Sequence, residues 1–165
     1  MNYNIFYIYL KQDDPKKSTM KKLERYGMAK KITINKMMGK IYLTPFSKNY
    51  LLNSDKVKYL NSGISVIDGS WNLINSIEKI GNKNARKLPL LLPVNPVNYG
   101  NPGKLSSLEA IAASLYIMGF HDIAENIISK YSWAEKFLIT NKEPLNEYSL
   151  CLNNEDCIYA EKLFF

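Results

Sequence analysis

Residues 88–103, LPLLLPVNPVNYGNPG, pass from an apolar run into a loop of Pro, Asn and Gly. The apolar run over 88–92 is typical of a buried strand. Three prolines and two glycines then fall within eleven residues, which restricts the backbone and excludes both helix and regular strand pairing. We therefore predict a buried strand followed by a loop held in one irregular shape. Such a loop either turns a corner or holds a ligand, and these residues alone leave both readings open.

A helix is expected directly after this loop. Ser106 and Glu109 have the spacing of a capping box, in which each side chain accepts a hydrogen bond from the other residue's backbone N–H. Apolar residues then recur on one face over 108–118, and Gly119 is suited to end the helix.

Strand-like and helix-like segments alternate along the rest of the chain. Strands are expected at 4–10, 32–34, 40–43 and 64–68, and helices at 18–26, after Ser54, and at 72–80, 122–130, 132–139 and 146–163. This alternation predicts an α/β fold with a mainly parallel sheet, in which ligands bind beyond the carboxyl ends of the strands. Three irregular loops fall at such ends, at 43–45, 68–71 and 95–100, and could form one site.

Composition limits the classes of protein to which the chain can belong. With 165 residues, 46% of them hydrophobic, it can form one full core, or one core with a small additional lobe. No apolar run approaches the roughly 18 residues of a membrane span, and the first residues do not resemble a secretion signal. We therefore expect a soluble, intracellular protein with no membrane partner.

Side chains that commonly carry metal or nucleophilic chemistry are few. Cys151 and Cys157 lack the spacing of a zinc site or a disulfide scaffold, and the sole histidine, His121, follows a helix-ending glycine. The sequence also lacks GxGxxG, P-loop and HExxH motifs, which removes support for the ordinary dinucleotide, P-loop and zinc-hydrolase classes. We expect no metal, and chemistry that works without histidine.

Positive charge is concentrated in the first third of the chain. Residues 1–50 hold eleven Lys or Arg and three acidic residues, a net charge of +8, whereas the remaining 115 residues sum to −1. Such asymmetry is typical of a surface that faces a polyanion such as RNA. A solvated lysine-rich face would give the same count.

Eight short blocks, in their order and spacing, carry a resemblance to a known family. They are DPKKST (14–19) with KLERYG (22–27), LTP (43–45), SD (54–55), DGSWN (68–72), RKLP (86–89), NPVNYGNP (95–102), LSSLEA (105–110) and LYIMG (115–119). Together they resemble the aminocarboxypropyltransferases that finish small-subunit ribosomal RNA, over residues 3–150. An ordered string of this length is far more specific than any single block.

The resemblance implies a SPOUT-like α/β fold. A small N-terminal α/β lobe would precede a domain with a C-terminal trefoil knot around the site of S-adenosylmethionine (SAM). We expect a basic, RNA-facing lobe over 1–60 and a SPOUT-like SAM-binding domain with a helical C-terminal part over 61–165. Periodicity alone would not reveal a knot, since true knots are rare.

The resemblance also implies the reaction and its participants. Members of the family transfer the 3-amino-3-carboxypropyl group of SAM, rather than its methyl group, to N3 of a pseudouridine or methylpseudouridine, and methylthioadenosine is released. We expect a cytoplasmic, monomeric enzyme that uses SAM as co-substrate and acts on small-subunit ribosomal RNA or a pre-ribosomal particle. Two alternatives stay open, a SPOUT-type RNA methyltransferase and a non-catalytic ribosome-assembly factor.

The chain departs from the family pattern in places. Gly69 stands where a cysteine is usual, which argues that this cysteine is no nucleophile, and LPV at 92–94 replaces small residues. The long acidic tail of eukaryotic members does not follow the helical region, so an archaeal-type member is expected.

The same resemblance assigns the cofactor site. Trp71 and Ile74, one helical turn apart, would enclose the methyl group of SAM, and Thr19 would hold its amino-acid end. Other members would frame the ribose and adenine, largely through backbone contacts. The full set is Thr19, Leu43, Ile67, Ser70, Trp71, Ile74, Leu91, Tyr99, Ser106 and Ala110. An ordinary core aromatic is the alternative reading for Trp71.

Asp68 is the candidate catalytic residue. The imide N3–H of the acceptor must lose its proton, so a nearby base should help. A carboxylate with an ordinary pKa near 4 is a weak base for this task, so either burial raises its pKa or Asp68 mainly orients the imide. A helix N-cap is a further reading.

Lys17, Lys22 and Arg25 are the candidate RNA contacts. On a helix, Lys22 and Arg25 share a face and Lys17 lies near the same edge, so the three can follow one phosphate backbone. A second candidate basic group consists of Lys83, Arg86, Lys87 and Lys104.

Overall fold

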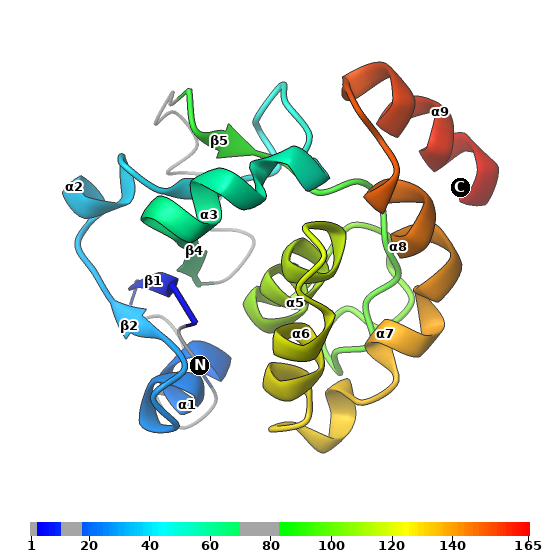
Figure 1. Cartoon of the computed structure of the whole chain (residues 1–165). Coiled ribbons are helices and arrows are strands. Elements are labelled where there is room, and N and C mark those ends of the chain that lie inside the picture. Colours follow the sequence, from blue (N-terminus) through cyan, green and yellow to red (C-terminus); the bar gives the residue numbers. More distant parts are fainter. Residues whose placement is uncertain (1–2, 11–17, 70–82) are drawn as a thin grey trace.

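A five-stranded sheet organises the chain, whose computed structural model describes residues 3–10, 18–69 and 83–165 (Figure 1). The strand order is β2-β1-β4-β3-β5. The strands are β1 (Ile5–Tyr9), β2 (Lys30–Lys31), β3 (Ile41–Leu43), β4 (Ile64–Asp68) and β5 (Ala85–Arg86). Every pairing between these described strands is parallel, which confirms the prediction from their alternation with helices.

Helices dominate the second half of the chain. The described helices are α1 (Thr19–Arg25), α2 (Ile34–Met37), α3 (Lys56–Ser62), α5 (Ser107–Ile117), α6 (His121–Ile128), α7 (Phe137–Thr140), α8 (Lys142–Ser149) and α9 (Asn154–Phe164), with 3₁₀ turns η1 (Asn53–Asp55) and η2 (Ser132–Ala134). Helix α5 contacts β4, α6 and α8, and Figure 1 shows α5 and α6 side by side. It is therefore the central helix of the core.

Alternate side chains of the central strands point into two different clusters. On β1, Ile5 and Tyr7 belong to the large cluster that also holds the buried residues of α5. Ile8 joins Tyr42 and Ile67 in a small cluster. This alternation follows from the two-residue period of a strand. Strand β4 is thus buried on both sides, as a central parallel strand should be.

Side-chain caps begin α5 and α1, the two helices whose first residues lie near the site described below. Ser106 Oγ accepts the N–H of Glu109 (3.2 Å), and Glu109 Oε2 accepts the N–H of Ser106 (2.8 Å), which confirms the predicted capping box of α5. Gly119 follows α5 with φ of +92°, a region that favours glycine. Helix α1 also begins at a serine N-cap, because Ser18 Oγ accepts the N–H of Lys21 (3.2 Å).

The prediction of a strand over 88–92 is wrong. The segment is not part of the sheet, and side chains bind its backbone instead. Asn141 accepts the N–H of Leu92 (2.8 Å) and donates to its carbonyl (2.9 Å), while the N–H of Leu90 donates to Glu161 (2.9 Å). Two prolines in and beside the segment have no N–H for a ladder, and the C-terminal helices supply the partners that a neighbouring strand would have given.

Other differences concern the edge strands. The strand expected over 32–34 lies two residues earlier, as β2, and Ile34 begins the short helix α2 instead. Strand β5 was not expected, since two residues carry no detectable period. The helix expected over 72–80 lies outside the described residues.

Two expected C-terminal helices are each divided. The segment 132–139 forms η2 and α7, and the segment 146–163 forms parts of α8 and α9. Asn153 accepts the N–H of Asp156 (2.8 Å) and so caps a new helix. A local cap of this kind outweighs a continuous apolar pattern.

Strands from both sides of residue 60 form the one sheet. β1, β2 and β3 precede this residue, and β4 and β5 follow it. The basic first third and the rest of the chain therefore share a sheet, and the division at residue 60 stays a prediction. Within the described residues, no helix is long and apolar enough to cross a membrane.

Candidate active site

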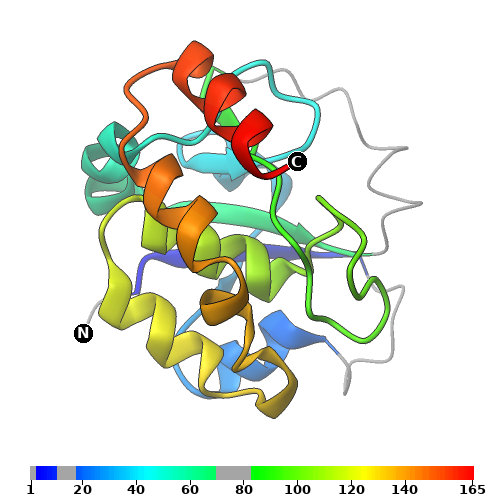
Figure 2. The same ribbon diagram turned by 90° about the vertical axis from the view of Figure 1, so that its right-hand side faces the viewer.

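A cavity of about 760 Å³ lies at the carboxyl ends of β3 and β4. Its walls include residues 43–45, 68–69 and 95–98, so the three loops that the sequence analysis placed at strand ends do contribute to one site. Figure 2 shows the last of these loops, in green, beyond the carboxyl end of β4. The volume falls in the range of small-molecule sites.

Asp68, the last residue of β4, is held between the starts of two helices. The hydroxyl of Ser18, the N-cap of α1, donates to Oδ2 of Asp68. The hydroxyl of Ser107, the first residue of α5, donates to Oδ1 (3.2 Å). The two hydroxyls therefore fix the direction of the carboxylate at the cavity wall. Sequence reasoning missed both serines, although each lies in a recognisable helix start.

Glu109 holds the loop that leads into α5. Its side chain is fully buried, and its Oε1 accepts the N–H groups of Val94 (2.7 Å) and Asn95 (3.0 Å). Its Oε2 accepts from Nδ2 of Asn95 (2.8 Å) in addition to the cap bond from Ser106. Four N–H donors compensate this carboxylate for its removal from water. One side chain thus both begins the helix and shapes the loop wall of the cavity.

The structure brings part of the predicted site together. Residues of that set that line the cavity are Thr19, Leu43, Ile67, Asp68, Ser106 and Ala110. Leu91 is fully buried in the core and Tyr99 is 77% exposed, and neither belongs to the lining of the described cavity. Ser70, Trp71 and Ile74 lie outside the described residues. The roles of all these residues stay predictions.

Two aromatic side chains that the sequence analysis did not select line the same cavity. Tyr131 and Trp133 follow α6, with ring centroids 5.7 Å apart. The hydroxyl of Tyr131 donates to the carbonyl oxygen of Thr19 (2.9 Å). Burial raises the pKa of Tyr131 above its ordinary range, so this hydroxyl stays a donor. No motif marks these residues, because they reach the site from a segment more than sixty residues after Asp68.

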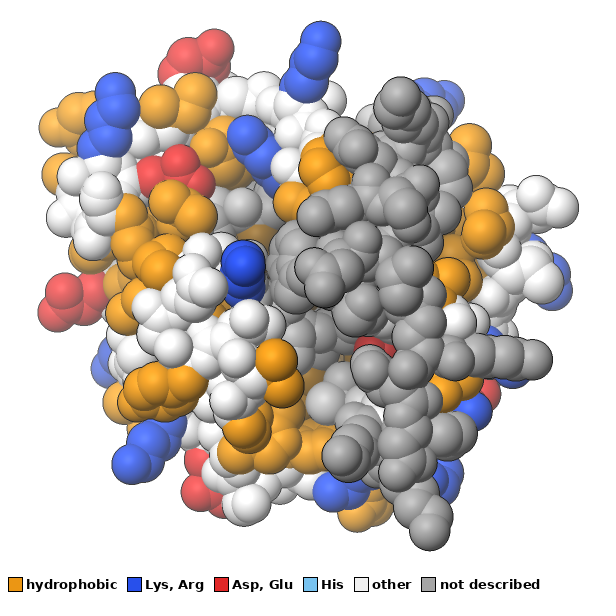
Figure 3. All heavy atoms as spheres, turned by 180° about the vertical axis from the view of Figure 1, so that it is seen from behind, with side chains coloured by type: hydrophobic (Ala, Val, Ile, Leu, Met, Phe, Trp, Pro, Cys, Tyr) orange, Lys and Arg blue, Asp and Glu red, His pale blue; other side chains and the backbone are white. Residues whose placement is uncertain are grey.

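Positive charge lies beside this aromatic wall. Nζ of Lys22, on α1, is 4.2 Å from the centroid of the Tyr131 ring, a cation–π contact, and Arg25 on the same helix is exposed. Lys17 lies outside the described residues. Figure 3 shows further Lys and Arg side chains among hydrophobic ones on the face opposite to that of Figure 1.

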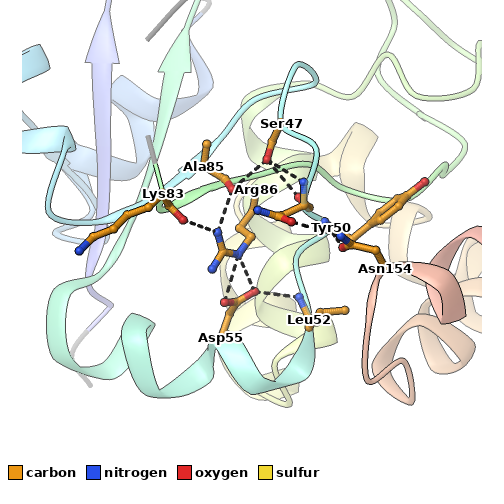
Figure 4. A network of polar contacts seen from close by, with 9 residues as sticks. Ser47, Tyr50, Leu52, Asp55, Lys83, Ala85, Arg86 and Asn154 are labelled. Atoms are coloured by element: carbon orange, nitrogen blue, oxygen red, sulfur yellow. Dashed lines mark hydrogen bonds and ion pairs between the residues drawn. The ribbon is translucent and has the colours of Figure 1, made fainter. Parts of the chain in front are cut away.

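Arg86, a member of the second basic group, binds a carboxylate and two carbonyl oxygens of the protein itself (Figure 4). Its Nε donates to both carboxylate oxygens of Asp55 (3.2 and 3.3 Å), and its Nη1 donates to the carbonyl oxygens of Lys83 and Ala85 (2.9 Å each). The carboxylate of Asp55 also accepts the N–H of Leu52 (2.9 Å). Arg86 therefore joins β5 to the start of α3.

The cavity suits a ligand with an apolar surface and charges of both signs. Leu43 and Ile67 offer apolar walls, and among the described lining residues Asp68 is acidic and Lys104 basic. SAM combines an aromatic base with a sulfonium, an ammonium and a carboxylate, so these residues fit it. In the described part of the chain, no group of three or more His, Cys, Asp or Glu side chains could hold a metal ion.

Comparisons with known sequences find one family profile and relatives that share one name. A family profile described as "Ribosome biogenesis protein, C-terminal" matches residues 41–165. The chain is 50% identical over 151 residues to a 16S rRNA aminocarboxypropyltransferase of Thermoplasma volcanium, with 92% of each chain covered. Identity to the protein of the same name from Thermoplasma acidophilum is 52% over 144 residues, with 87% of this chain and 88% of the relative covered.

A solved structure agrees with the sequence comparisons. The SAM-dependent rRNA:acp-transferase of Vulcanisaeta distributa matches this fold with a TM-score of 0.87 and 38% sequence identity, over 96% of this chain and 87% of that one. The match thus covers nearly the whole chain. By sequence and by fold, as the eight ordered blocks predicted, this chain belongs to the family of rRNA aminocarboxypropyltransferases.

Proposed function

We propose that this chain transfers the 3-amino-3-carboxypropyl group of SAM to N3 of a pseudouridine or methylpseudouridine in small-subunit ribosomal RNA. One observation carries the proposal. Identity of 50% over nearly the full length to a protein of that named activity coincides with a cavity that gathers Asp68 and five of the expected cofactor residues. The family supplies the type of reaction, and the cavity supplies the residues that would perform it.

Asp68 would receive the imide proton of the acceptor. The two hydroxyls fix the direction of this carboxylate at the cavity wall, and a carboxylate can accept from several donors at once, so N3–H of a bound base can be one of its donors. When bound, SAM would supply the carbon that joins its 3-amino-3-carboxypropyl group to the sulfonium. A bond forms from N3 to this carbon, the bond from the carbon to sulfur breaks, and the electron pair of that bond leaves on the sulfur of methylthioadenosine. The anchored carboxylate orients the imide and takes its proton as the new bond forms, which supplies the electron pair for attack.

The other wall residues would select which carbon of the sulfonium reacts. We propose that Trp71 and Ile74 enclose the methyl group, so that it cannot reach the acceptor, and that Ser70 is a further cofactor contact. Thr19 and Ser106 would hold the amino-acid and ribose ends of SAM, while Leu43, Ile67 and Ala110 would cover the nucleoside. Leu91, which is buried in the core, and Tyr99, which is exposed, complete this proposed set, although neither lines the described cavity.

Larger features of the family are proposed with the reaction. They are a SPOUT-like trefoil knot in the C-terminal part, a basic RNA-facing lobe over 1–60, a monomeric state, and a place of action in the cytoplasm. Side chains of α9 and of the residue before α8 bind the extended segment 88–92, which supports an unusual chain path at this point. The net charge of +8 in residues 1–50 supports an RNA-facing surface.

Separate labels in SAM test the function. The protein is incubated with small-subunit ribosomal RNA from archaeal cells that lack this enzyme and with SAM labelled either in its methyl group or in its carboxyl group. We expect the carboxyl label in RNA and the methyl label in released methylthioadenosine. The methyl label in RNA would instead identify a methyltransferase. Absence of transfer, with no binding of SAM by calorimetry, would identify a non-catalytic assembly factor.

A further inference from the structure

We infer that Trp133, with Tyr131 beside it, is the stacking surface for a nucleobase of the RNA, namely the uracil-type base that accepts the transferred group. This inference rests on the proposed function and adds to it a binding site for the second substrate. Both side chains line the cavity that holds Asp68. They lie outside the set of residues expected to contact SAM.

Tyr131 is joined to Asp68 by a short series of contacts. Asp68 accepts from the hydroxyl of Ser18, Ser18 is followed by Thr19, and the Thr19 carbonyl accepts from the Tyr131 hydroxyl at 2.9 Å. The aromatic wall and the proposed base catalyst therefore occupy one side of the same cavity. A base that stacks there lies near the carboxylate that must receive its N3 proton.

The two rings are held in place before any ligand arrives. Both are partly buried and pack against the main core, and the hydroxyl of Tyr131 is anchored. Trp133 lies within the 3₁₀ turn η2, which restricts its backbone. A fixed aromatic surface loses little conformational freedom when a base stacks on it.

The charges beside the rings indicate a nucleotide rather than another flat ligand. Lys22 lies over the Tyr131 ring at 4.2 Å, and Arg25 is exposed on the same helix. A nucleotide presents a base and a phosphate together, so an aromatic surface bordered by cations matches both of its parts. An acceptor base within paired RNA would have to leave its stack to reach Asp68, and an aromatic surface in the cavity would receive it.

Substitution of Trp133 tests the inference. Trp133→Leu keeps an apolar side chain but removes the stacking surface, Trp133→Phe retains a ring, and Tyr159→Leu removes an exposed aromatic ring from α9 as a matched control. Affinity is measured for 16S ribosomal RNA from cells lacking the enzyme, and for SAM by calorimetry. We expect Trp133→Leu to weaken RNA binding about tenfold, the loss typical of one base–aromatic stack, with SAM affinity unchanged. Trp133→Phe should restore most of the RNA affinity, and Tyr159→Leu should match the unsubstituted protein.

Two results would overturn the inference. Weakened SAM binding with unchanged RNA binding would make Trp133 a cofactor contact, and an RNA affinity equal to that of Tyr159→Leu would make it a packing residue. If Trp133→Leu does not fold, 4-thiouridine-substituted RNA is photocrosslinked to the unsubstituted protein. A crosslink within residues 131–133 supports the inference, and crosslinks confined to other peptides refute it.

The test is independent of which group is transferred. RNA affinity and crosslinking report the stacking contact even if the methyl label enters RNA. The labelling experiment therefore can fail while the stacking inference stands, and the reverse is also possible.

Discussion

At the scale of single residues, the carboxylate of Asp68 is held by two hydroxyl groups and also lines the cavity. Asp68→Asn keeps the shape of the side chain but loses its charge and one acceptor oxygen. We expect transfer to fall by about 10²–10⁴-fold, the usual range for loss of a general base, while SAM affinity is retained. Single-turnover transfer of the carboxyl label and calorimetry measure the two quantities.

Ser107→Ala provides the matched control for Asp68. It removes one of the two hydroxyls that hold the carboxylate and leaves the carboxylate itself. Transfer should fall less than in Asp68→Asn. If Asp68→Asn loses SAM binding and transfer to the same extent, Asp68 is a structural residue and another group must receive the proton.

At the scale of elements, α5 and the loop before it form one unit through Glu109. Glu109→Gln replaces one acceptor oxygen with an NH₂ group, which then faces N–H donors that it cannot satisfy. We expect the free energy of unfolding to fall by about 2 kcal/mol, and SAM affinity to fall as the loop wall loosens. Urea unfolding and calorimetry check both effects, with Glu125→Gln on the exposed side of α6 as control. Unchanged SAM affinity in a destabilised protein would show that the loop keeps its shape without Glu109.

The contact between β5 and the start of α3 predicts a second effect at this scale (Figure 4). The Arg86 and Asp55 side chains are 22% and 11% exposed, so solvent partly screens their ion pair. In a double-mutant cycle of Arg86→Gln and Asp55→Asn, we expect a coupling energy of about 1 kcal/mol, measured by urea unfolding. A coupling near zero would mean that the two side chains act separately, for example Arg86 through the carbonyl oxygens that it binds.

The elements that the sequence predicted are those whose signals are local. Helix α5 follows from its own capping box, and β4 has the predicted bounds because a short β-branched segment lies between Gly63 and Gly69. The segment 88–92 could not be assigned correctly, since its backbone partners include Asn141 and Glu161, 49 and 71 residues away from the groups they bind.

The candidate site shows the same limit. Asp68, Leu43 and Ser106 could be found because they lie in blocks that the sequence shares with its family. Tyr131 and Trp133 could not, because only the three-dimensional path of the chain brings them to the cavity.

At the scale of the whole molecule, the excess of positive charge and the cavity meet at α1. This helix begins at Ser18, which contacts Asp68, and carries Lys22 beside the aromatic wall. The part of the chain with a net charge of +8 therefore reaches the cavity of the proposed reaction. Long-range attraction can bring RNA to this side of the molecule, and short-range contacts can then select the base.

The salt dependence of RNA binding tests this arrangement. If Lys17, Lys22 and Arg25 each neutralise one phosphate, replacing all three with Gln should reduce the slope of log K against log salt concentration by roughly 0.7 to 0.9 per contact, with the lower figure for single-stranded loops. SAM affinity should not change, because Lys22 and Arg25 do not line the cavity. The matched control replaces Lys56 and Lys58 on α3 and Lys142 on α8 with Gln, which lowers the net charge by the same amount as the first triple variant. Equal slopes for the two triple variants would show that net charge governs RNA binding, and not the position of α1 beside the cavity. A smaller slope for the variant of Lys17, Lys22 and Arg25 alone would show that these cations contact the phosphates.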